Sequence, residues 1–329
     1  IPIIDINNKI KFIIKKEFEN LKIGNKIISM NNVCASYQGV IIALQDISLS
    51  VEVGAIVALL GANGAGKTTV INQIYGSEVP DSGTVFLNGE NITELTTPRR
   101  VKKGIGRSFQ ISNVLTHFTV IENAIIAEQA RRDEAFRFVH PAFSDENLIA
   151  GAKVILERVG LQNRYNDPVA GLAHGERRLL ELALALSGTP SLLLLDEPLA
   201  ALDKKLRVQT QFELVNLQYK LGITFIIVTH DQEEAMSLSD RMAIMKEGNI
   251  LQVGNPVEVY EKPSDKYVAN FIGTANLFHL DKINEKTLIK ELNVEVSNNS
   301  SQNKNLCLIR PEKIKIQKFE NQNTQNQCL

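Results

Sequence analysis

A glycine-rich segment in the first quarter of the chain has the residue types that bind a polyphosphate. It fits the pattern GxxxxGK[ST] and consists of Gly61, Ala62, Asn63, Gly64, Ala65, Gly66, Lys67, Thr68 and Thr69. Glycines let backbone N–H groups curl around phosphate oxygens. We therefore predict a nucleotide site, with Lys67 on the β- and γ-phosphates and Thr68 on Mg²⁺. The motif alone does not separate a kinase, a GTPase and a transport ATPase.

Two adjacent carboxylates follow an apolar run later in the chain. Asp196 and Glu197 come directly after Leu192 to Leu195. Adjacent acids at a buried strand end are costly unless they are used. We predict that Asp196 holds Mg²⁺, directly or through water, and that Glu197 polarises the attacking water. An ordinary strand end with solvated acids is the simpler alternative.

Both motifs stand at the ends of short, nearly unbroken apolar runs. The three runs are Ala55 to Leu60, Leu192 to Leu195 and Ile223 to Val228. Such runs are typical of strands buried on both faces of a parallel sheet, whose carboxyl ends carry the chemistry. His230 follows the third run. The chemical groups are thus expected at one edge of one sheet.

Helical patterns lie between these runs. One pattern stops at Gly160 and consists of Leu148, Ala152, Ile155, Leu156 and Val159. Val208, Phe212 and Val215 repeat the pattern before Gly222. The alternation of strand, turn and helix predicts an α/β fold.

Charge and composition exclude some classes of protein. The 329 residues carry 36 basic and 37 acidic side chains, so no global field attracts a polyanion, and we expect no nucleic-acid partner. The three cysteines show no CxxC spacing, which favours a reducing compartment. No window approaches 18 consecutive apolar residues, so membrane association is expected through partners. Residues 1–27 are interpreted as a peripheral extension, with a membrane-surface helix as the alternative.

A short peptide, Leu172 to Glu176, precedes the acidic strand end. Together with the glycine-rich loop, this peptide resembles the corresponding segment of ABC ATPases. In that family a signature peptide at this position caps a helix whose N-terminus binds the γ-phosphate held by the other subunit. The resemblance implies this grip for Ala173, His174, Gly175 and Glu176, and hence a dimer. The common signature has Ser second, Gly third and Gln fifth, so this peptide departs from it and lacks one hydroxyl. Without the family, it predicts only a helix start.

Further positions resemble ABC motifs in order and spacing between residues 28 and about 255. Gln110 resembles the Q-loop glutamine, which senses Mg²⁺ and water and signals to the transmembrane partner. Asp203 ends a segment that resembles the D-loop, which crosses the dimer interface. His230 resembles the switch histidine on the γ-phosphate. Tyr37 resembles the aromatic residue that stacks on adenine, with a half-buried strand aromatic as the alternative.

The two parts of the chain resemble different importers. Residues 30 to about 190 are similar to branched-chain amino acid importer ATPases, through the glycine-rich loop, the insert around residues 131–143 and the signature peptide. Leu221 to Ala235 and Arg310 to Glu312 are similar to spermidine/putrescine importer ATPases. We favour polyamine import, and branched-chain or other amino acid import is the alternative.

A change of composition near residue 256 indicates a second domain. We predict a P-loop (RecA-like) ATPase core at residues 28–255, a helical subdomain at about 111–185, and a regulatory β domain with a disordered tail at 256–329. The polyamine family implies a β-barrel there, of which this segment resembles the first part. A truncated chain, a recombined or reconstructed hybrid, and a barrel completed by a partner dimer all stay open.

The resemblance also implies a mechanism. Two copies, or two paired ABC ATPase subunits, close on two Mg·ATP molecules and push permease subunits outward-facing. Glu197, His230 and Gln110 form the catalytic set, and Thr68, Asp196 and Gln110 the metal set. The expected place is peripheral, on the cytoplasmic face of the cell membrane, with an extracytoplasmic solute-binding protein as an indirect partner.

Two other classes of function are less compatible with these motifs. Soluble ABC ATPases of DNA repair or ribosomes normally carry long coiled-coil insertions or tandem cassettes, and this chain shows one cassette. A nucleotide kinase would share only the glycine-rich loop, and the signature and D-loop segments disfavour it.

Overall fold

The computed structural model describes residues 25–108, 114–131, 142–200, 203–283, 286–291, 294–296 and 306–314. Contacts within the chain divide it into two units, residues 1–259 and 260–329, and this division falls within helix α9 (Pro256–Glu261). The first 24 residues of the predicted N-terminal extension lie outside the described residues. In the described part of the chain, no helix combines the length and apolar character needed to cross a membrane.

The first unit is built on a six-stranded sheet with the order β10-β9-β3-β8-β7-β6. Five of its strands run parallel, namely β3 (Ile56–Gly61), β6 (Ile105–Ser108), β7 (Leu192–Asp196), β8 (Thr224–Thr229) and β9 (Arg241–Lys246). The edge strand β10 (Asn249–Gly254) pairs antiparallel with β9. The three apolar runs are therefore confirmed as neighbouring strands, and their carboxyl ends meet at one edge of the sheet.

The apolar runs are unbroken because both faces of this sheet are covered. Leu193 and Leu195 of β7 belong to one buried cluster, and Leu192 and Leu194 belong to the other. Successive side chains of a strand point to opposite faces, so a strand with helices or a second sheet on each side needs an apolar residue at every position.

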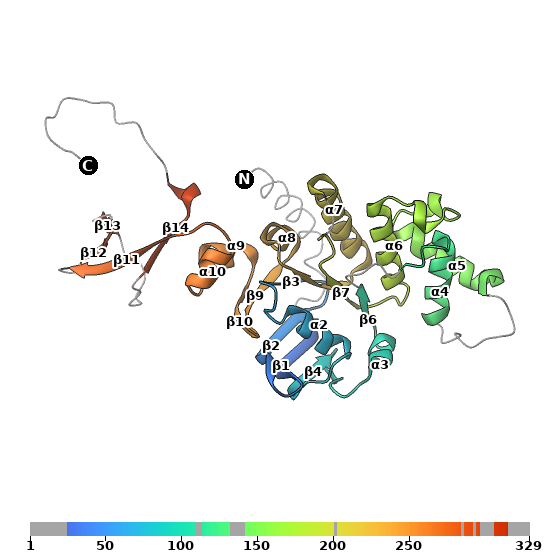
Figure 1. Ribbon diagram of the computed structural model, residues 1–329, viewed down its shortest axis with the longest axis horizontal. Coiled ribbons are helices and arrows are strands. Elements are labelled where there is room, and N and C mark those ends of the chain that lie inside the picture. Colours follow the sequence, from blue (N-terminus) through green and yellow to red (C-terminus); the bar gives the residue numbers. More distant parts are fainter. Residues whose placement is uncertain are drawn as a thin grey trace, which may run out of the picture. The chain divides into compact units, whose positions relative to one another are not determined.

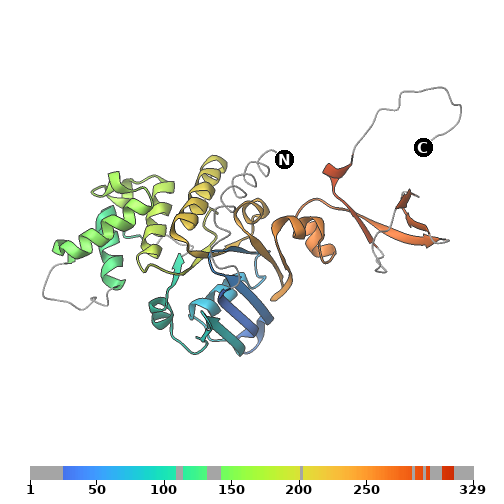
Figure 2. The same cartoon turned by 180° about the vertical axis from the view of Figure 1, so that it is seen from behind.

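A second, antiparallel sheet covers one face. It has the order β2-β1-β4-β5 and consists of β1 (Lys26–Tyr37), β2 (Ile41–Glu52), β4 (Ser82–Leu87) and β5 (Glu90–Asn91). Helix α2 (Lys67–Tyr75) shares its buried cluster, and α3 (Thr97–Lys102) follows in the chain. Figures 1 and 2 show this sheet on the side of the central sheet opposite to α7.

Helices α6 (His174–Leu186), α7 (Lys204–Leu221) and α8 (Gln232–Leu238) contribute to the buried cluster on the other face, and α4 (Val120–Arg131) and α5 (Glu146–Arg158) pack on α6. Short 3₁₀ turns η1 (Ala142–Ser144), η2 (Gln162–Arg164) and η3 (Val169–Gly171) connect them. The helical pattern that ends at Gly160 is confirmed as α5, with Gly160 at φ 79°. Helices α4, α5 and α6 pack on one another.

Helix α7 exists as predicted, but the expected apolar face was wrong. Val208 and Phe212 are 42% and 40% exposed, whereas Leu214 and Leu217 are buried. Val215 is only partly buried against the same cluster. Helix periodicity places residues on a common face, but the packing partner decides which face is covered.

The second unit contains α10 (Lys266–Phe271), η4 (Pro311–Lys313) and a four-stranded antiparallel sheet. The sheet has the order β13-β12-β11-β14, formed by β13 (Val294–Val296), β12 (Lys286–Ile289), β11 (Asn276–Ile283) and β14 (Leu306–Ile309). The buried Arg310 donates hydrogen bonds to the carbonyls of Ala269, Gly273, Thr274 and Tyr260. The partial barrel stays a prediction, because several connecting segments lie outside the described residues.

Candidate functional site

The glycine-rich loop connects β3 to α2, at the carboxyl edge of the central sheet. Gly64 and Gly66 have φ angles of 80° and 98°, in the left-handed region that favours glycine. A Cβ at Gly61 would lie 2.5 Å from the Met245 carbonyl oxygen, and one at Gly66 would lie 2.7 Å from that of Ala43. The loop therefore requires glycine for both its shape and its packing.

Lys67 begins helix α2, and its ammonium group turns back onto the loop. Its Nζ donates to the carbonyl oxygens of Gly61 at 2.7 Å and of Ala62 at 2.9 Å. Burial lowers the pKa of Lys67, while the nearby Glu197 and Asp196 carboxylates oppose that shift. A lysine ammonium has three donors, and two loop carbonyls use two of them. The third is left for an anionic ligand.

Asp196 ends strand β7 with an incompletely bonded carboxylate. The side chain is buried, and within the described part of the chain its Oδ1 has no hydrogen-bond partner. Its Oδ2 lies 3.4 Å from a guanidinium nitrogen of Arg107. Burial raises the pKa of Asp196, and Arg107 acts against this rise. A buried carboxylate oxygen without a partner is costly unless a cation binds there.

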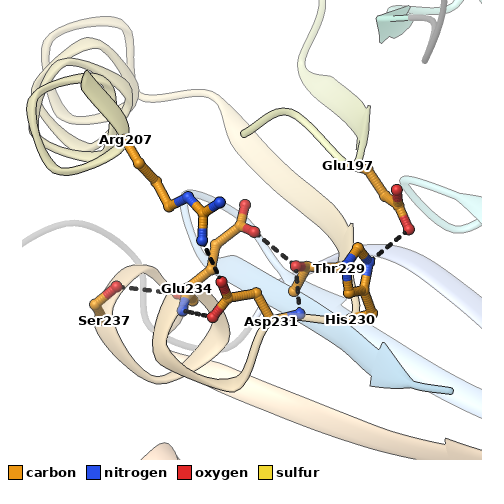
Figure 3. A network of polar contacts seen from close by, with 7 residues as sticks. All are labelled: Glu197, Arg207, Thr229, His230, Asp231, Glu234 and Ser237. Carbon is orange, nitrogen blue, oxygen red and sulfur yellow. Dashed lines mark hydrogen bonds and ion pairs between the residues drawn. The ribbon is translucent and has the colours of Figure 1, made fainter. Parts of the chain in front are cut away.

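Glu197 and His230 face each other from the ends of neighbouring strands β7 and β8. The Glu197 Oε1 atom lies 2.9 Å from His230 Nδ1 (Figure 3). Glu197 has a φ of 46°, and its backbone N–H donates to the Val228 carbonyl at 2.9 Å. A non-glycine residue in this region is often held there by its surroundings at a functional site. The backbone thus turns this carboxylate toward the histidine.

Tyr37 ends strand β1 and is 44% exposed. Its hydroxyl lies 2.8 Å from Thr69 Oγ1 in helix α2. This bond ties the aromatic ring to the glycine-rich loop, although the two residues are 32 positions apart. The ring is therefore a half-exposed strand aromatic that is also anchored beside the loop.

The signature peptide opens helix α6. Ala173 stands at the N-cap without a side-chain acceptor, and its own N–H donates to the Glu176 carboxylate at 3.0 Å. Arg164 Nε holds the other oxygen of this carboxylate at 2.9 Å. These hydrogen bonds of Ala173 and Glu176 lie within the helical layer, and Ala173 and His174 are exposed.

Of two further predicted site residues, Asp203 is described by the structure and Gln110 is not. Asp203 immediately precedes α7 and is exposed, and its carbonyl accepts the Arg207 N–H at 2.8 Å. Gln110 lies outside the described residues, so its assigned role stays a prediction.

Arg107, near the end of strand β6, was not predicted as a site residue. Its guanidinium contacts Asp196 and donates to Asn72 Oδ1 at 2.8 Å, and it lies over the Tyr75 ring. It therefore connects α2 to the acidic strand end. The sequence feature that could have pointed to Arg107 is its position three residues before Gln110, a predicted site residue.

A polar network beside His230 was not predicted from the sequence either. This network links Thr229, Asp231, Glu234 and Arg207 (Figure 3). Asp231 and Glu234 follow His230 closely in the sequence, whereas Arg207 comes from another helix.

Comparison with known proteins identifies the wider class. Residues 44–200 match the family model described as ABC transporter. The chain is 38% identical over 312 residues to the spermidine/putrescine import ATP-binding protein PotA of Fusobacterium nucleatum subsp. nucleatum, covering 92% of this chain and 79% of that relative. It is also 38% identical to the Spiroplasma citri protein of the same name, covering 88% and 80% of the two chains.

Solved structures show the same architecture. The ADP conformation of MJ1267, an ATP-binding cassette of an ABC transporter, matches with a TM-score of 0.67 and 28% identity, covering 74% of this chain and 98% of that chain. The protein cbiO1 from Clostridium perfringens, part of the ABC transporter complex cbiONQ, matches with a TM-score of 0.64 and 27% identity, covering 73% and 93%.

Proposed function

The chain belongs to the family of ABC transporter ATP-binding proteins, and on that premise we propose that it is the ATP-hydrolysing subunit of a spermidine and putrescine importer. The observation that supports the substrate is the 38% identity over 92% of the chain to a relative named for this import. An alignment of this length extends beyond the ATPase unit into the second unit.

The residues at the sheet edge fit Mg·ATP. The buried Asp196 Oδ1, which has no hydrogen-bond partner among the described residues, and the exposed Thr68 hydroxyl are hard oxygen donors of the kind that Mg²⁺ prefers. When bound, Mg²⁺ would neutralise charge on the phosphate oxygens. Lys67 and the left-handed glycine loop would hold the phosphates, and Tyr37 would support the adenine ring.

Glu197 is assigned as the general base for hydrolysis. Its carboxylate lies at the edge that holds Lys67 and Asp196, and it is bonded to His230. An ionised carboxylate only accepts hydrogen bonds, so His230 Nδ1 donates this one and orients the group that takes a proton from water. Gln110 is proposed to complete the catalytic and metal sets.

A complete site is proposed to need two copies of the chain or a paired ABC ATPase subunit. Ala173, His174 and Asp203 are exposed, as the surface of such a dimer requires. The N–H groups at the start of α6 would bind the γ-phosphate held by the partner subunit's loop. Closure would drive permease subunits, with the chain peripheral on the cytoplasmic face of the membrane and a solute-binding protein acting indirectly.

An uptake experiment tests this proposal. Cells that lack their own polyamine-import ATPase but retain its permease would be supplied with this chain, and entry of radiolabelled spermidine would be measured. We expect uptake with the wild-type chain and none with Glu197→Gln. Absence of uptake, with the chain expressed and bound to the permease, would contradict the proposed substrate.

The alternative substrate class is a branched-chain or other amino acid. The signature peptide Leu172 to Glu176 favours it, because this peptide resembles those of branched-chain importers. Leucine uptake in a matching strain that lacks its own import ATPase, without spermidine uptake in the first strain, would assign the chain to that class.

A further inference from the structure

An ion pair connects the start of α7 to the residue that follows His230. Arg207 lies on α7, and its guanidinium lies 2.6 Å from Asp231 Oδ2 (Figure 3). The two side chains are 34% and 27% exposed, so the pair is partly shielded from water. A charge-assisted hydrogen bond of this length is stronger than a neutral one.

The turn that carries His230 is held by polar bonds on both sides of the histidine. Thr229 Oγ1 accepts the Asp231 N–H at 3.0 Å and donates to Glu234 Oε2 at 2.6 Å. Asp231 Oδ1 in turn accepts the Glu234 N–H at 3.1 Å and caps helix α8. His230 therefore lies between two residues whose positions are set by this network.

The other end of the ion pair is bonded through the backbone to Asp203, the residue before α7. Arg207 stands in the first turn of α7, where its backbone N–H donates to the Asp203 carbonyl at 2.8 Å. A displacement of Asp203 therefore displaces the base of the Arg207 side chain. Since Asp203 is exposed, a partner subunit can reach it.

The turn is not packed on every side. A small cavity of about 80 Å³ lies beside it, and its lining includes Glu197, Arg207, His230, Asp231 and Glu234. A gap next to a side chain removes some of the contacts that would fix it, so the polar bonds contribute more to its position. The turn can thus respond when one of these bonds changes.

We propose that Arg207 and Asp231 are positioning residues that tie Asp203 to the turn carrying His230, so that the position of Asp203 sets the His230–Glu197 hydrogen bond. The inference rests on the proposed function, since it concerns regulation of that hydrolytic site. Neither side chain is assigned a contact with nucleotide.

The test removes the pair while it preserves the helix. Asp231→Asn keeps an N-cap oxygen for α8 and removes the charge. Arg207→Gln removes the guanidinium, and Lys205→Gln, at an exposed cation on the same helix, is the matched control. Each variant is made in the full chain, and its fold is checked by thermal unfolding.

We expect kcat for ATP hydrolysis to fall about tenfold in each of the two pair variants, with ATP affinity changed less than about twofold. The double variant should fall no further, because both substitutions remove one interaction. Arg207→Lys should recover part of kcat, because it restores the charge. Lys205→Gln should hydrolyse ATP as the wild type does.

A second readout does not depend on turnover. In protein labelled with ¹⁵N at histidine, the His230 ring resonances, assigned with His230→Gln, report which nitrogen carries the proton. We expect them to shift in Arg207→Gln and not in Lys205→Gln. Unchanged resonances, or losses of kcat that multiply in the double variant, would overturn the inference.

The two proposals fail in different ways. If the wild-type chain hydrolyses ATP and Glu197→Gln does not, but the pair variants match the control, only the positioning role is wrong. If the wild-type chain does not hydrolyse ATP, the proposed function is wrong, and the histidine resonances still decide whether the pair positions His230.

Discussion

At the scale of single residues, the site depends on charged and polar groups that face one another at the sheet edge. Asp196 has a carboxylate oxygen without a hydrogen bond in the described part of the chain, and Lys67 is held by two loop carbonyls. Glu197 and His230 are held by each other. A buried polar group with few partners costs stability, and a bound charged ligand offsets that cost.

The role of Glu197 leads to a direct prediction. Replacing Glu197 with Gln keeps the shape and removes the proton acceptor, so ATP hydrolysis should fall by roughly 10²- to 10⁴-fold. Nucleotide binding should persist, because the loop and Lys67 are unchanged. Phosphate release and equilibrium binding of a fluorescent ATP analogue measure the two quantities, and near-normal turnover would exclude Glu197 as the base.

Glu234 should make stability depend on pH. This side chain is 3% exposed, and burial raises its pKa to about 7. Asp231 adds to this rise, whereas the Thr229 hydrogen bond, Arg207 and His230 oppose it. Because the folded state holds the proton more tightly than the unfolded chain, this contribution to stability is full below about pH 4.5 and is lost as the pH rises through about 7.

Glu234→Gln should remove that dependence. The amide is neutral at every pH and can still accept a hydrogen bond from Thr229. The free energy of unfolding of the variant, relative to that of the wild type, should therefore rise by on the order of 1–3 kcal/mol between about pH 5 and about pH 8.5. Thermal unfolding at the two pH values measures the difference. The neighbouring exposed Glu233→Gln is the control, and an equal change in both variants would argue against a buried titrating group.

At the scale of elements, the site is formed where strands end and helices begin. The carboxyl ends of β3, β7 and β8 supply the loop, the two acids and the turn of His230. Helix α2 directs its N-terminus at the loop, which favours an anion there. The geometry of the phosphate site therefore depends on how closely the β3–α2 loop approaches strand β9.

Gly61→Ala tests this approach. The added Cβ would lie 2.5 Å from the Met245 carbonyl oxygen of β9, so a strand must shift. We expect a loss of roughly 1–3 kcal/mol of stability and weaker nucleotide binding. Gly188→Ala is the control, because its Cβ would meet open space. A melting temperature equal to that of the control would show that the loop tolerates the side chain.

At the scale of the whole molecule, we propose that the ATPase unit carries only part of each complete site. The glycine-rich loop and the acids lie at the sheet edge, whereas the hydrogen bonds of Ala173 and Glu176 in the signature peptide lie within the helical layer. The second unit contains its own sheet and its own buried arginine, Arg310. Completion of the site is therefore expected from another subunit.

Mixing two inactive variants tests the composite site. Lys67→Ala removes the phosphate lysine, and Ala173→Asp places a negative charge where the partner's phosphate would bind. Each variant alone should hydrolyse ATP at least tenfold more slowly than the wild type. Mixed dimers contain one undamaged site, so a mixture should regain part of the activity. If mixing restores nothing while dimers form, the two elements do not act across subunits.

Local chemistry allowed much of the site to be predicted from sequence. Glycines at fixed spacing, an apolar run followed by two acids, and a histidine after another apolar run are each readable within a few residues. The parallel strands β3, β7 and β8 then bring these segments to one edge. The family resemblance added Tyr37, Gln110 and the signature peptide, whose roles stay predictions.

By itself, the sequence determined the α/β class, the phosphate loop and the place of the acids, because these depend on periodicity and short spacing. Only the tertiary structure decided that Arg107 contacts Asp196, that Arg207 pairs with Asp231, and that α7 buries Leu214 in place of Phe212. These features depend on how separate elements cross and pack. Arg107 and Asp196 are 89 positions apart and come into contact only after the sheet has formed, so no local sequence pattern predicts their contact.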